Sequence, residues 1–207
     1  IYILTGDGDG AQTRSIGILK TVNGGLTWQA TDLSFGVLDD IRGYKLLMHP
    51  TDPQIMFAAT TNGIYKTYDG WDSYHWEIAG HFYDIEFKPN NPSVVYAATN
   101  LHFWKSIDEG VHWTNSATGL PLVDSYRIAI GVSPDDNNVV YLLYGRDDLD
   151  ESRSPFVGLY RSYDNGANFT LKCDTPNIIG STPTGIDSVG QYTWDLSIAV
   201  NPLNNHE

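Results

Sequence analysis

A repeat of roughly 45 residues constrains the fold of this chain more than any other feature. Three segments share one pattern: a base, a hydroxyl residue, any residue, Asp or Asn, any residue, Gly, two further residues and an aromatic one. Numbered from the hydroxyl residue, they are box 1 (Thr21–Trp28), box 3 (Ser106–Trp113) and box 4 (Ser162–Phe169). Box 2 (Thr67–Tyr74) keeps the hydroxyl and the Asp but carries its Gly one place early.

A second marker runs out of phase with the boxes. It is an apolar segment, a Pro, a polar turn and another apolar segment with an aromatic residue seven places after the Pro. Runs of β-branched and aromatic residues bounded by Pro, Asn, Asp and Gly are typical of strands. Alternating the two markers predicts four strands per repeat, and thus an all-β fold: a β-propeller of about four blades, each a four-stranded antiparallel sheet. The pairs of Pro and aromatic residue are Pro50 and Phe57, Pro89 and Tyr96, and Pro134 and Tyr141.

The expected blades cover residues 1–40, 41–80, 81–122 and 123–192, and residues 193–207 start a next blade or close the first. In each box we expect the Asp side chain to accept backbone N–H bonds in its own turn. The Gly supplies a positive φ, and the closing aromatic residue packs between blades. A structural role is therefore assigned to Thr21, Asn23, Gly25, Trp28, Thr67, Asp69, Ser106, Asp108, Gly110, Trp113, Ser162, Asp164, Gly166 and Phe169.

The box pattern resembles the Asp-box, or BNR repeat, of sialidases, sortilin-type propellers, xyloglucan-cleaving glycosidases and photosystem assembly factors. The segments 17–21, 62–67 and 158–162 are most similar to sortilin-type, glycosyl hydrolase-like propellers of exported Bacteroidetes proteins, which often carry a type IX secretion signal. This resemblance implies a secreted or cell-surface bacterial protein with more blades than this chain provides. A closed four-blade ring is the alternative, because joining the two ends places Tyr2 seven residues after Pro202.

Composition excludes several classes of protein. The chain has 12 Lys and Arg against 25 Asp and Glu, a net charge of −13 that disfavours nucleic acid and anionic membranes as partners. It contains no apolar stretch long enough for a membrane helix. Its single cysteine, Cys173, and the lack of zinc-ligand spacings predict no cofactor. Calcium is a weak candidate at Asp147, Asp148 and Asp150, where an ordinary solvated acidic loop is the favoured interpretation.

Ligands of propellers generally bind at the channel mouth, on loops and inner-strand ends. The predicted inner strands, 45–48, 84–87, 127–132 and 195–200, place Lys45, Asp84, Glu86, Arg127 and Asp195 there. Asp84 and Asp195 could supply the carboxylate pair of a glycosidase, but solvated, tunnel-lining carboxylates bonded to neighbouring strands are the favoured interpretation.

Aromatic residues of box 2 offer a second kind of candidate site. Trp71 and Trp76 could stack on sugar rings or anchor a protein partner, whereas packing between blades is the favoured interpretation for most of these aromatic residues. The displaced Gly of box 2 predicts that Trp71 is exposed.

No catalytic residue is assigned. A sialidase resemblance would imply an arginine triad and a Phe-Arg-Ile-Pro-like segment before the first box. The segment 126–129 (Tyr-Arg-Ile-Ala) lacks the Pro and follows box 3, so sialidase activity is rejected. The sequence predicts a non-catalytic binding or scaffold propeller that engages a protein or a glycan through loops at the channel mouth. The alternative is a glycoside hydrolase whose active site is completed by residues outside this chain.

Overall fold

The computed structural model describes residues 1–8, 13–121, 127–146, 154–190 and 196–206. These residues form fourteen β-strands and one 3-10 helix. The chain divides into two compact units, residues 1–85 and 86–207. In the described part of the chain no helix has the length and apolar character that crossing a bilayer requires.

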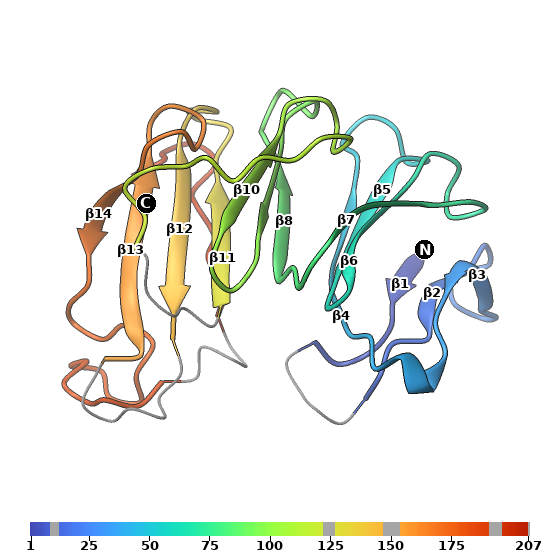
Figure 1. The fold of residues 1–207 in the computed structure, drawn as a ribbon, viewed down its shortest axis with the longest axis horizontal. Coiled ribbons are helices and arrows are strands. Elements are labelled where there is room, and N and C mark those ends of the chain that lie inside the picture. Colours follow the sequence, from blue (N-terminus) through green and yellow to red (C-terminus); the bar gives the residue numbers. More distant parts are fainter. Residues whose placement is uncertain (9–12, 122–126, 147–153, 191–195, 207) are drawn as a thin grey trace. The chain divides into compact units, whose positions relative to one another are not determined.

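The first unit holds two antiparallel sheets, with strand orders β1-β2-β3 and β4-β5-β6-β7 (Figure 1). The middle strands β5 and β6 are buried along their whole length, because both faces of the second sheet are covered. The bounds are β1 (Tyr2–Leu4), β2 (Gly17–Lys20), β3 (Gln29–Ser34), η1 (Val37–Asp39), β4 (Gly43–Met48), β5 (Met56–Thr60), β6 (Gly63–Thr67) and β7 (His75–Ala79).

The third sheet has the order β10-β9-β8, and the fourth, in the second unit, has the order β11-β12-β13-β14. The predicted series of four antiparallel sheets is confirmed, although the first and third sheets have three strands each. In the third sheet the expected outer strand is reduced to a single bridge between Lys105 and Thr114. The bounds are β8 (Asp84–Phe87), β9 (Val95–Ala98), β10 (Phe103–Ser106), β11 (Arg127–Val132), β12 (Val140–Gly145), β13 (Phe156–Ser162) and β14 (Thr170–Cys173).

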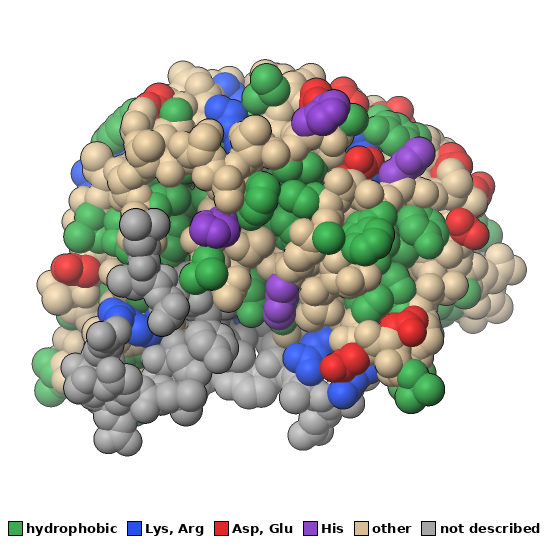
Figure 2. Space-filling view, viewed as in Figure 1, with side chains coloured by type: hydrophobic (Ala, Val, Ile, Leu, Met, Phe, Trp, Pro, Cys, Tyr) green, Lys and Arg blue, Asp and Glu red, His purple; other side chains and the backbone are tan. Residues whose placement is uncertain are grey.

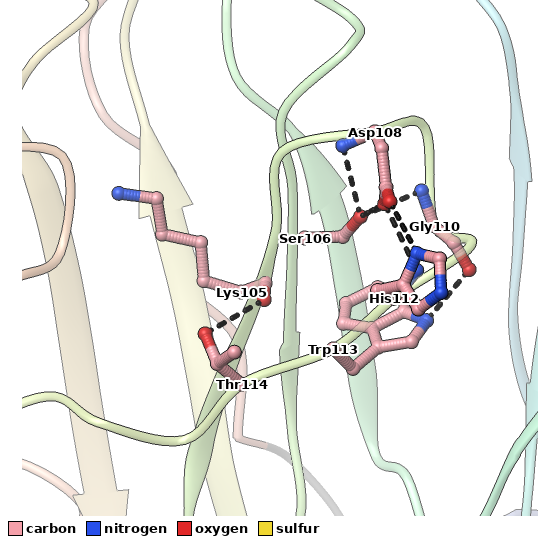
Figure 3. Close-up of polar contacts among 7 residues, drawn as sticks. All are labelled: Lys105, Ser106, Asp108, Gly110, His112, Trp113 and Thr114. Carbon is pink, nitrogen blue, oxygen red and sulfur yellow. Dashed lines mark hydrogen bonds and ion pairs between the residues drawn. The ribbon is translucent and has the colours of Figure 1, made fainter.

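All four boxes close through the same hydrogen bonds. In box 3 the Ser106 hydroxyl donates to Asp108 Oδ1 at 2.8 Å and accepts the Gly110 N–H at 2.8 Å. The His112 N–H donates to the same Asp108 oxygen at 2.9 Å (Figure 3). Equivalent bonds recur in boxes 1, 2 and 4. The prediction that the acidic side chain is bonded inside its own turn is therefore confirmed.

The residue at position seven of each box also belongs to the turn, although the sequence pattern left this position open. In three boxes its side chain bonds the second carboxylate oxygen at position three, at 2.6 Å in each case. In box 1 donor and acceptor are exchanged: the Asn23 side-chain amide at position three donates to Thr27 Oγ1 at 2.8 Å. The position was missed because four different residue types fill it, namely Thr27, Ser73, His112 and Asn168.

The two sequence markers meet as cross-strand pairs. The aromatic residue of the Pro marker lies opposite the base that precedes the box, as Phe57 lies opposite Lys66. The Lys66 ammonium is 5.1 Å from the centroid of that ring, which is the geometry of a cation–π contact. Two other bases lie over their partner rings in the same way, Lys20 over Tyr2 at 5.5 Å and Arg161 over Tyr141 at 5.1 Å.

The closing aromatic residues of the boxes pack less uniformly than predicted. Phe169 is 4% exposed and meets Phe103 of the preceding sheet edge to face, with ring centroids 5.2 Å apart. Trp28 and Trp113 are only half-buried, so the expectation that all three rings are sealed between blades is wrong for these two. Trp113 instead folds over its own hairpin, where its indole N–H donates to the Gly110 carbonyl at 2.8 Å (Figure 3).

The predicted inner strand at 195–200 is not observed, since residues 196–200 form no strand. The segment still packs on the fourth sheet: Leu196 is 4% exposed, and the Ser133 hydroxyl donates to the Asn201 carbonyl at 2.7 Å. The Tyr141 hydroxyl donates to the Asn205 carbonyl at 2.9 Å. Side-chain packing is thus present without the cross-strand ladder that defines a strand.

Candidate functional site

Of the residues predicted at the channel, Lys45 and Asp84 lie together in the first unit. The Lys45 ammonium is 2.6 Å from Asp84 Oδ1, and the Ile85 N–H donates to the same oxygen at 2.9 Å. The Asp84 side chain is only 13% exposed. The arrangement links Lys45, within β4, to Asp84, the first residue of β8, so Asp84 has a structural partner in the folded protein.

The other candidates are spread along the chain. Glu86 and Arg127 are both half-buried, Glu86 within β8 and Arg127 at the first residue of β11. Asp195 lies outside the described residues, so the proposed pair of Asp84 with Asp195 is untested. The calcium candidates Asp147, Asp148 and Asp150 also lie outside them. Among the residues that are described, no group of three or more His, Cys, Asp or Glu side chains could hold a metal ion.

Trp71 is a core residue, which corrects the prediction that it is exposed. Its side chain is 0% exposed and belongs to a cluster with Ile18, Leu33 and Met56. Trp71 occupies position five of box 2, the position of the glycine in the other boxes, and has a φ of 70°. The backbone thereby turns the indole into the core, so Trp71 is removed from the candidate ligand-binding residues.

Trp76, by contrast, is 54% exposed, and its indole lies beside Gly63 of the neighbouring strand. Its ring stacks on Tyr65 with centroids 6.1 Å apart and planes at 14°, and Tyr74 meets Tyr65 edge to face at 5.7 Å. Gly63 makes this possible, because a Cβ there would lie 2.3 Å from the Trp76 indole nitrogen. Figure 2 shows hydrophobic side chains at the surface in the region where Figure 1 places β6 and β7. We call Tyr65, Tyr74 and Trp76 the Trp76 platform.

Polar groups border the Trp76 platform. The Asn62 amide donates to the Tyr65 hydroxyl at 2.9 Å. The pKa of Tyr65 is raised, first because burial disfavours the phenolate and then because Asp39 and Tyr74 add negative charge nearby, while the Asn62 bond acts in the opposite direction. Aromatic rings with a side-chain amide beside them are chemically suited to a sugar ring, which has an apolar C–H face and a rim of hydroxyl groups.

A second aromatic group lies at the inner strands of the first unit. Tyr44, His81 and Tyr83 pack together, with His81 and Tyr83 stacked at 4.2 Å. His81 Nε2 and the Tyr44 hydroxyl are 2.9 Å apart. The pKa of His81 is lowered to about 4, mainly because burial disfavours the imidazolium and also because of the Arg42 charge. The sequence analysis missed this group because its members come from two segments almost forty residues apart.

In the second unit a pocket of about 390 Å³ lies between β10 and box 4. It forms because the segment that pairs with β10 does so only at Thr114, through two backbone hydrogen bonds with Lys105, and then turns away from β10. The Thr118 N–H then donates to the Ala167 carbonyl at 3.0 Å, and the Phe169 N–H donates to the Thr118 carbonyl at 2.9 Å. We call it the Lys105 pocket; residues lining it include Phe103, Lys105, Ile107, Thr114, Ala117 and Ala167.

The Lys105 ammonium makes no hydrogen bond, ion pair or ring contact with any residue that the structure describes. Figure 3 shows it extending from β10, away from the Asp108 and His112 side chains, which pair at 2.6 Å. Burial lowers the pKa of Lys105, and the charge of Lys88 lowers it further, against an opposing effect of Asp164. The pocket therefore combines a partly desolvated cation with a mixed lining, in which apolar side chains stand beside Asp108, His112 and the hydroxyl groups of Thr114 and Ser116.

Comparison with known proteins identifies the fold and no family. No protein-family profile matches the chain. No curated protein matches it. Among solved structures, an ancestral GH74 enzyme aligns with a TM-score of 0.61 and 19% identity, over 87% of this chain and 24% of that one. The GH74 enzyme of Niastella koreensis aligns with a TM-score of 0.66 and 19% identity, over 91% of this chain and 31% of that one.

These likenesses, together with the four antiparallel sheets, confirm the predicted β-propeller fold. The chain spans less than a third of the length of either GH74 enzyme. A structure of YCF48 bound to D1 peptide aligns with a TM-score of 0.49 and 14% identity, over 87% of this chain and 57% of that one. At this level the likeness to YCF48 supports no functional argument.

Proposed function

We propose that this chain is a non-catalytic, glycan-binding part of a β-propeller, with the Trp76 platform as its binding surface. The observation that carries the proposal is the geometry of Trp76: its indole lies nearly parallel to the Tyr65 ring, with centroids 6.1 Å apart, and 54% of the residue is exposed. An exposed large aromatic ring held flat by a second ring loses little conformational entropy when a ligand stacks on it. Secretion or surface display, and the sortilin-type affiliation, belong to this proposal and rest on the resemblance of the box segments.

A protein ligand is the other occupant that the sequence left open. The Trp76 platform favours a glycan, because polar groups act on its Tyr65: the Asn62 amide bonds the Tyr65 hydroxyl, and the charge of Asp39 affects it electrostatically. An interface with a protein partner commonly has a wider apolar core around its aromatic anchor residues.

The proposal is tested by affinity electrophoresis of the 207-residue chain through gels that contain a panel of neutral and acidic polysaccharides. We expect retardation by at least one polysaccharide, which Trp76→Ala abolishes. Tyr163→Ala is the matched control, because Tyr163 is also 54% exposed but lies in the second unit. Retardation that Trp76→Ala leaves intact, or no retardation in any gel, would overturn the proposal.

A glycoside hydrolase completed by residues outside this chain is the second candidate, and the names of the two GH74 structures bring it into consideration. A glycosidase needs two suitably spaced carboxyl groups. Of the predicted pair, Asp84 is engaged by Lys45 and by a backbone N–H. Release of reducing ends from a retained polysaccharide would support the enzyme over the binding module, so the same samples discriminate between the two.

A further inference from the structure

We propose that the Lys105 pocket binds the carboxylate of a uronic acid residue in a glycan, with the Lys105 ammonium as the counter-ion. This is a second site, separate from the Trp76 platform. It uses residues of the second unit only, so either proposal can fail without the other.

The need for an anion follows from comparison with the other bases that precede the boxes. Lys20 is 3.5 Å from an Asp72 carboxylate oxygen, and the Arg161 guanidinium bonds the side chains of Asn205 and His206. Lys66 is enclosed by two rings, with its ammonium 5.1 Å from the centroid of Phe57 and 4.2 Å from that of Tyr68. In each case a partner within the protein compensates the charge.

Lys105 occupies the same position in the repeat, but among the residues that the structure describes it has no hydrogen bond, ion pair or ring contact of this kind, and only the more distant charge of Asp164 favours its ammonium form. Its neighbour at position two of the box is Ile107, where boxes 2 and 4 place a tyrosine. A partly buried cation without a partner is unfavourable unless an anion joins it. The pocket beside the ammonium gives a ligand anion room to do so.

The lining selects a carboxylate on a sugar. Lys105 offers a single point charge, so the charge alone requires only an anion, and the remaining lining decides which group carries it. The hydroxyl groups of Thr114 and Ser116 and the exposed imidazole of His112 can bond sugar hydroxyls. Phe103 and Ile107 provide apolar contact for the C–H face of the ring. The volume of about 390 Å³ is in the range of small-molecule sites.

The net charge of −13 would repel an anionic ligand, but the charges nearest to the pocket matter most. Charges on the solvent-exposed surface are screened beyond about 8 Å at physiological ionic strength. Asp108 and Asp164 are closer, but both carboxylates are bonded by donors of their own box turns. Asp108 itself lines the pocket and keeps its charge, but Figure 3 shows the Lys105 side chain extending away from it, so we place the bound carboxylate at the Lys105 end of the pocket.

The test is titration of the 207-residue chain with sodium glucuronate, with glucose and with the peptide Gly-Glu-Gly, followed by NMR or calorimetry. Lys105→Met removes the charge and keeps the apolar stem. Lys172→Met is the matched control, because Lys172 is an exposed lysine of β14 outside the pocket. Ala167→Trp fills the pocket without changing its charge, and circular dichroism with thermal melting verifies the fold of every variant.

We expect saturable binding of glucuronate, with glucose and the Lys105→Met variant each weaker by about tenfold or more. Lys172→Met should bind like the parent chain, and Ala167→Trp should not bind. Equal affinity for glucose and glucuronate, or unchanged binding by Lys105→Met or Ala167→Trp, would overturn the proposal. Tighter binding of Gly-Glu-Gly than of glucuronate would also overturn it and would identify an acidic peptide as the ligand.

Discussion

The Trp71 N–H donates to Thr67 Oγ1 at 2.9 Å, the hydrogen bond that a glycine N–H makes in the other three boxes. Trp71 has a φ of 70°, against 95°, 85° and 76° for the glycines at the same position. A left-handed backbone costs a residue with a Cβ about 1–2 kcal/mol. Burial of the whole indole offsets this cost, since Trp71 is 0% exposed in the core of the first unit.

Replacement of Trp71 by Gly should therefore destabilise the protein, although it restores the usual residue at this position of the box. Loss of a buried tryptophan side chain costs about 3–5 kcal/mol. Relief of the left-handed strain returns about 1–2 kcal/mol, so the net loss is about 1–4 kcal/mol. Urea unfolding measures it, with Trp76→Gly as a comparison at an exposed position. An unchanged or raised free energy of unfolding for Trp71→Gly would contradict this account of box 2.

Trp71 also shows where prediction from the sequence ends. The spacing of Thr67, Asp69 and the later boxes was sufficient to predict four sheets and the bonding inside each turn. The displaced Gly70 suggested a degenerate turn with an exposed tryptophan. The structure keeps the turn and buries the ring, because Gly70 and Trp71 both adopt a positive φ. A pattern of residue types does not reveal that a tryptophan tolerates the glycine conformation when a core cavity receives its side chain.

The Lys105 pocket was beyond sequence reasoning for a different reason. It depends on the path of residues 114–119, which leave β10 and pair with box 4. Nothing in their spacing distinguishes this path from an ordinary outer strand. The Trp76 platform was partly predictable: Trp76 was identified, whereas its support by Tyr65 depends on the register of β6 and β7.

The box carboxylates should make stability depend on acid. The pKa of Asp164 is lowered to about 2, chiefly by the Asn168 side-chain bond. The pKa of Asp69 and that of Asp108 are also lowered to about 2, by bonds from the side chain of Ser73 and the backbone of His112 respectively. These pKa values lie below those of the same groups in the unfolded chain, which are near 4. The stabilisation that the three carboxylates give the folded protein is therefore complete above about pH 4. It is lost as pH falls toward 2.

Thermal melting from pH 6 to pH 2 measures this dependence. The triple variant Asp69→Asn, Asp108→Asn, Asp164→Asn should show a smaller decline of melting temperature below pH 4 than the parent chain. Box 1 supplies the inverse experiment, since it carries Asn23 where the others have Asp. Asn23→Asp should make the decline steeper. A triple variant with the same acid dependence as the parent chain would show that the box carboxylates are not its source.

His81 should add a separate pH dependence closer to neutrality. Its pKa is lowered to about 4, from an ordinary value near 6.5. Because the unfolded chain binds the proton more tightly, protonation of His81 favours unfolding. The stability of the folded protein is therefore unaffected by His81 above about pH 6.5 and declines as pH falls toward 4. Between pH 7.5 and pH 5 we expect a loss of about 1 kcal/mol, allowing for screening by solvent.

Urea unfolding at several pH values, with His81→Gln alongside, measures the effect. The variant should lack the decline between pH 7.5 and pH 5, and His75→Gln, which removes an exposed histidine, should retain it. An NMR titration of the His81 ring with a midpoint near 6.5 would refute the expectation directly.

Two glycines with nearly the same φ should differ in their tolerance of a methyl group. Gly24 has a φ of 72°, and a Cβ there would meet nothing within 4 Å. Gly119 has a φ of 77°, and its Cβ would lie 2.0 Å from the Phe169 carbonyl oxygen. Gly24→Ala should cost only the left-handed strain, about 1–2 kcal/mol. In Gly119→Ala the new methyl group must also displace the Phe169 backbone, which is hydrogen-bonded to Thr118. This variant should therefore cost about 2–4 kcal/mol in total.

The difference between the two variants isolates the contact, because the conformational strain is common to both. Free energies of unfolding in urea provide the comparison. Since residues 114–119 form one side of the Lys105 pocket, Gly119→Ala should also weaken glucuronate binding, whereas Gly24→Ala, in box 1 of the first unit, should leave it unchanged. Equal stability losses for the two variants would mean that residues 118–119 are not held against box 4 as the hydrogen bonds of Thr118 indicate.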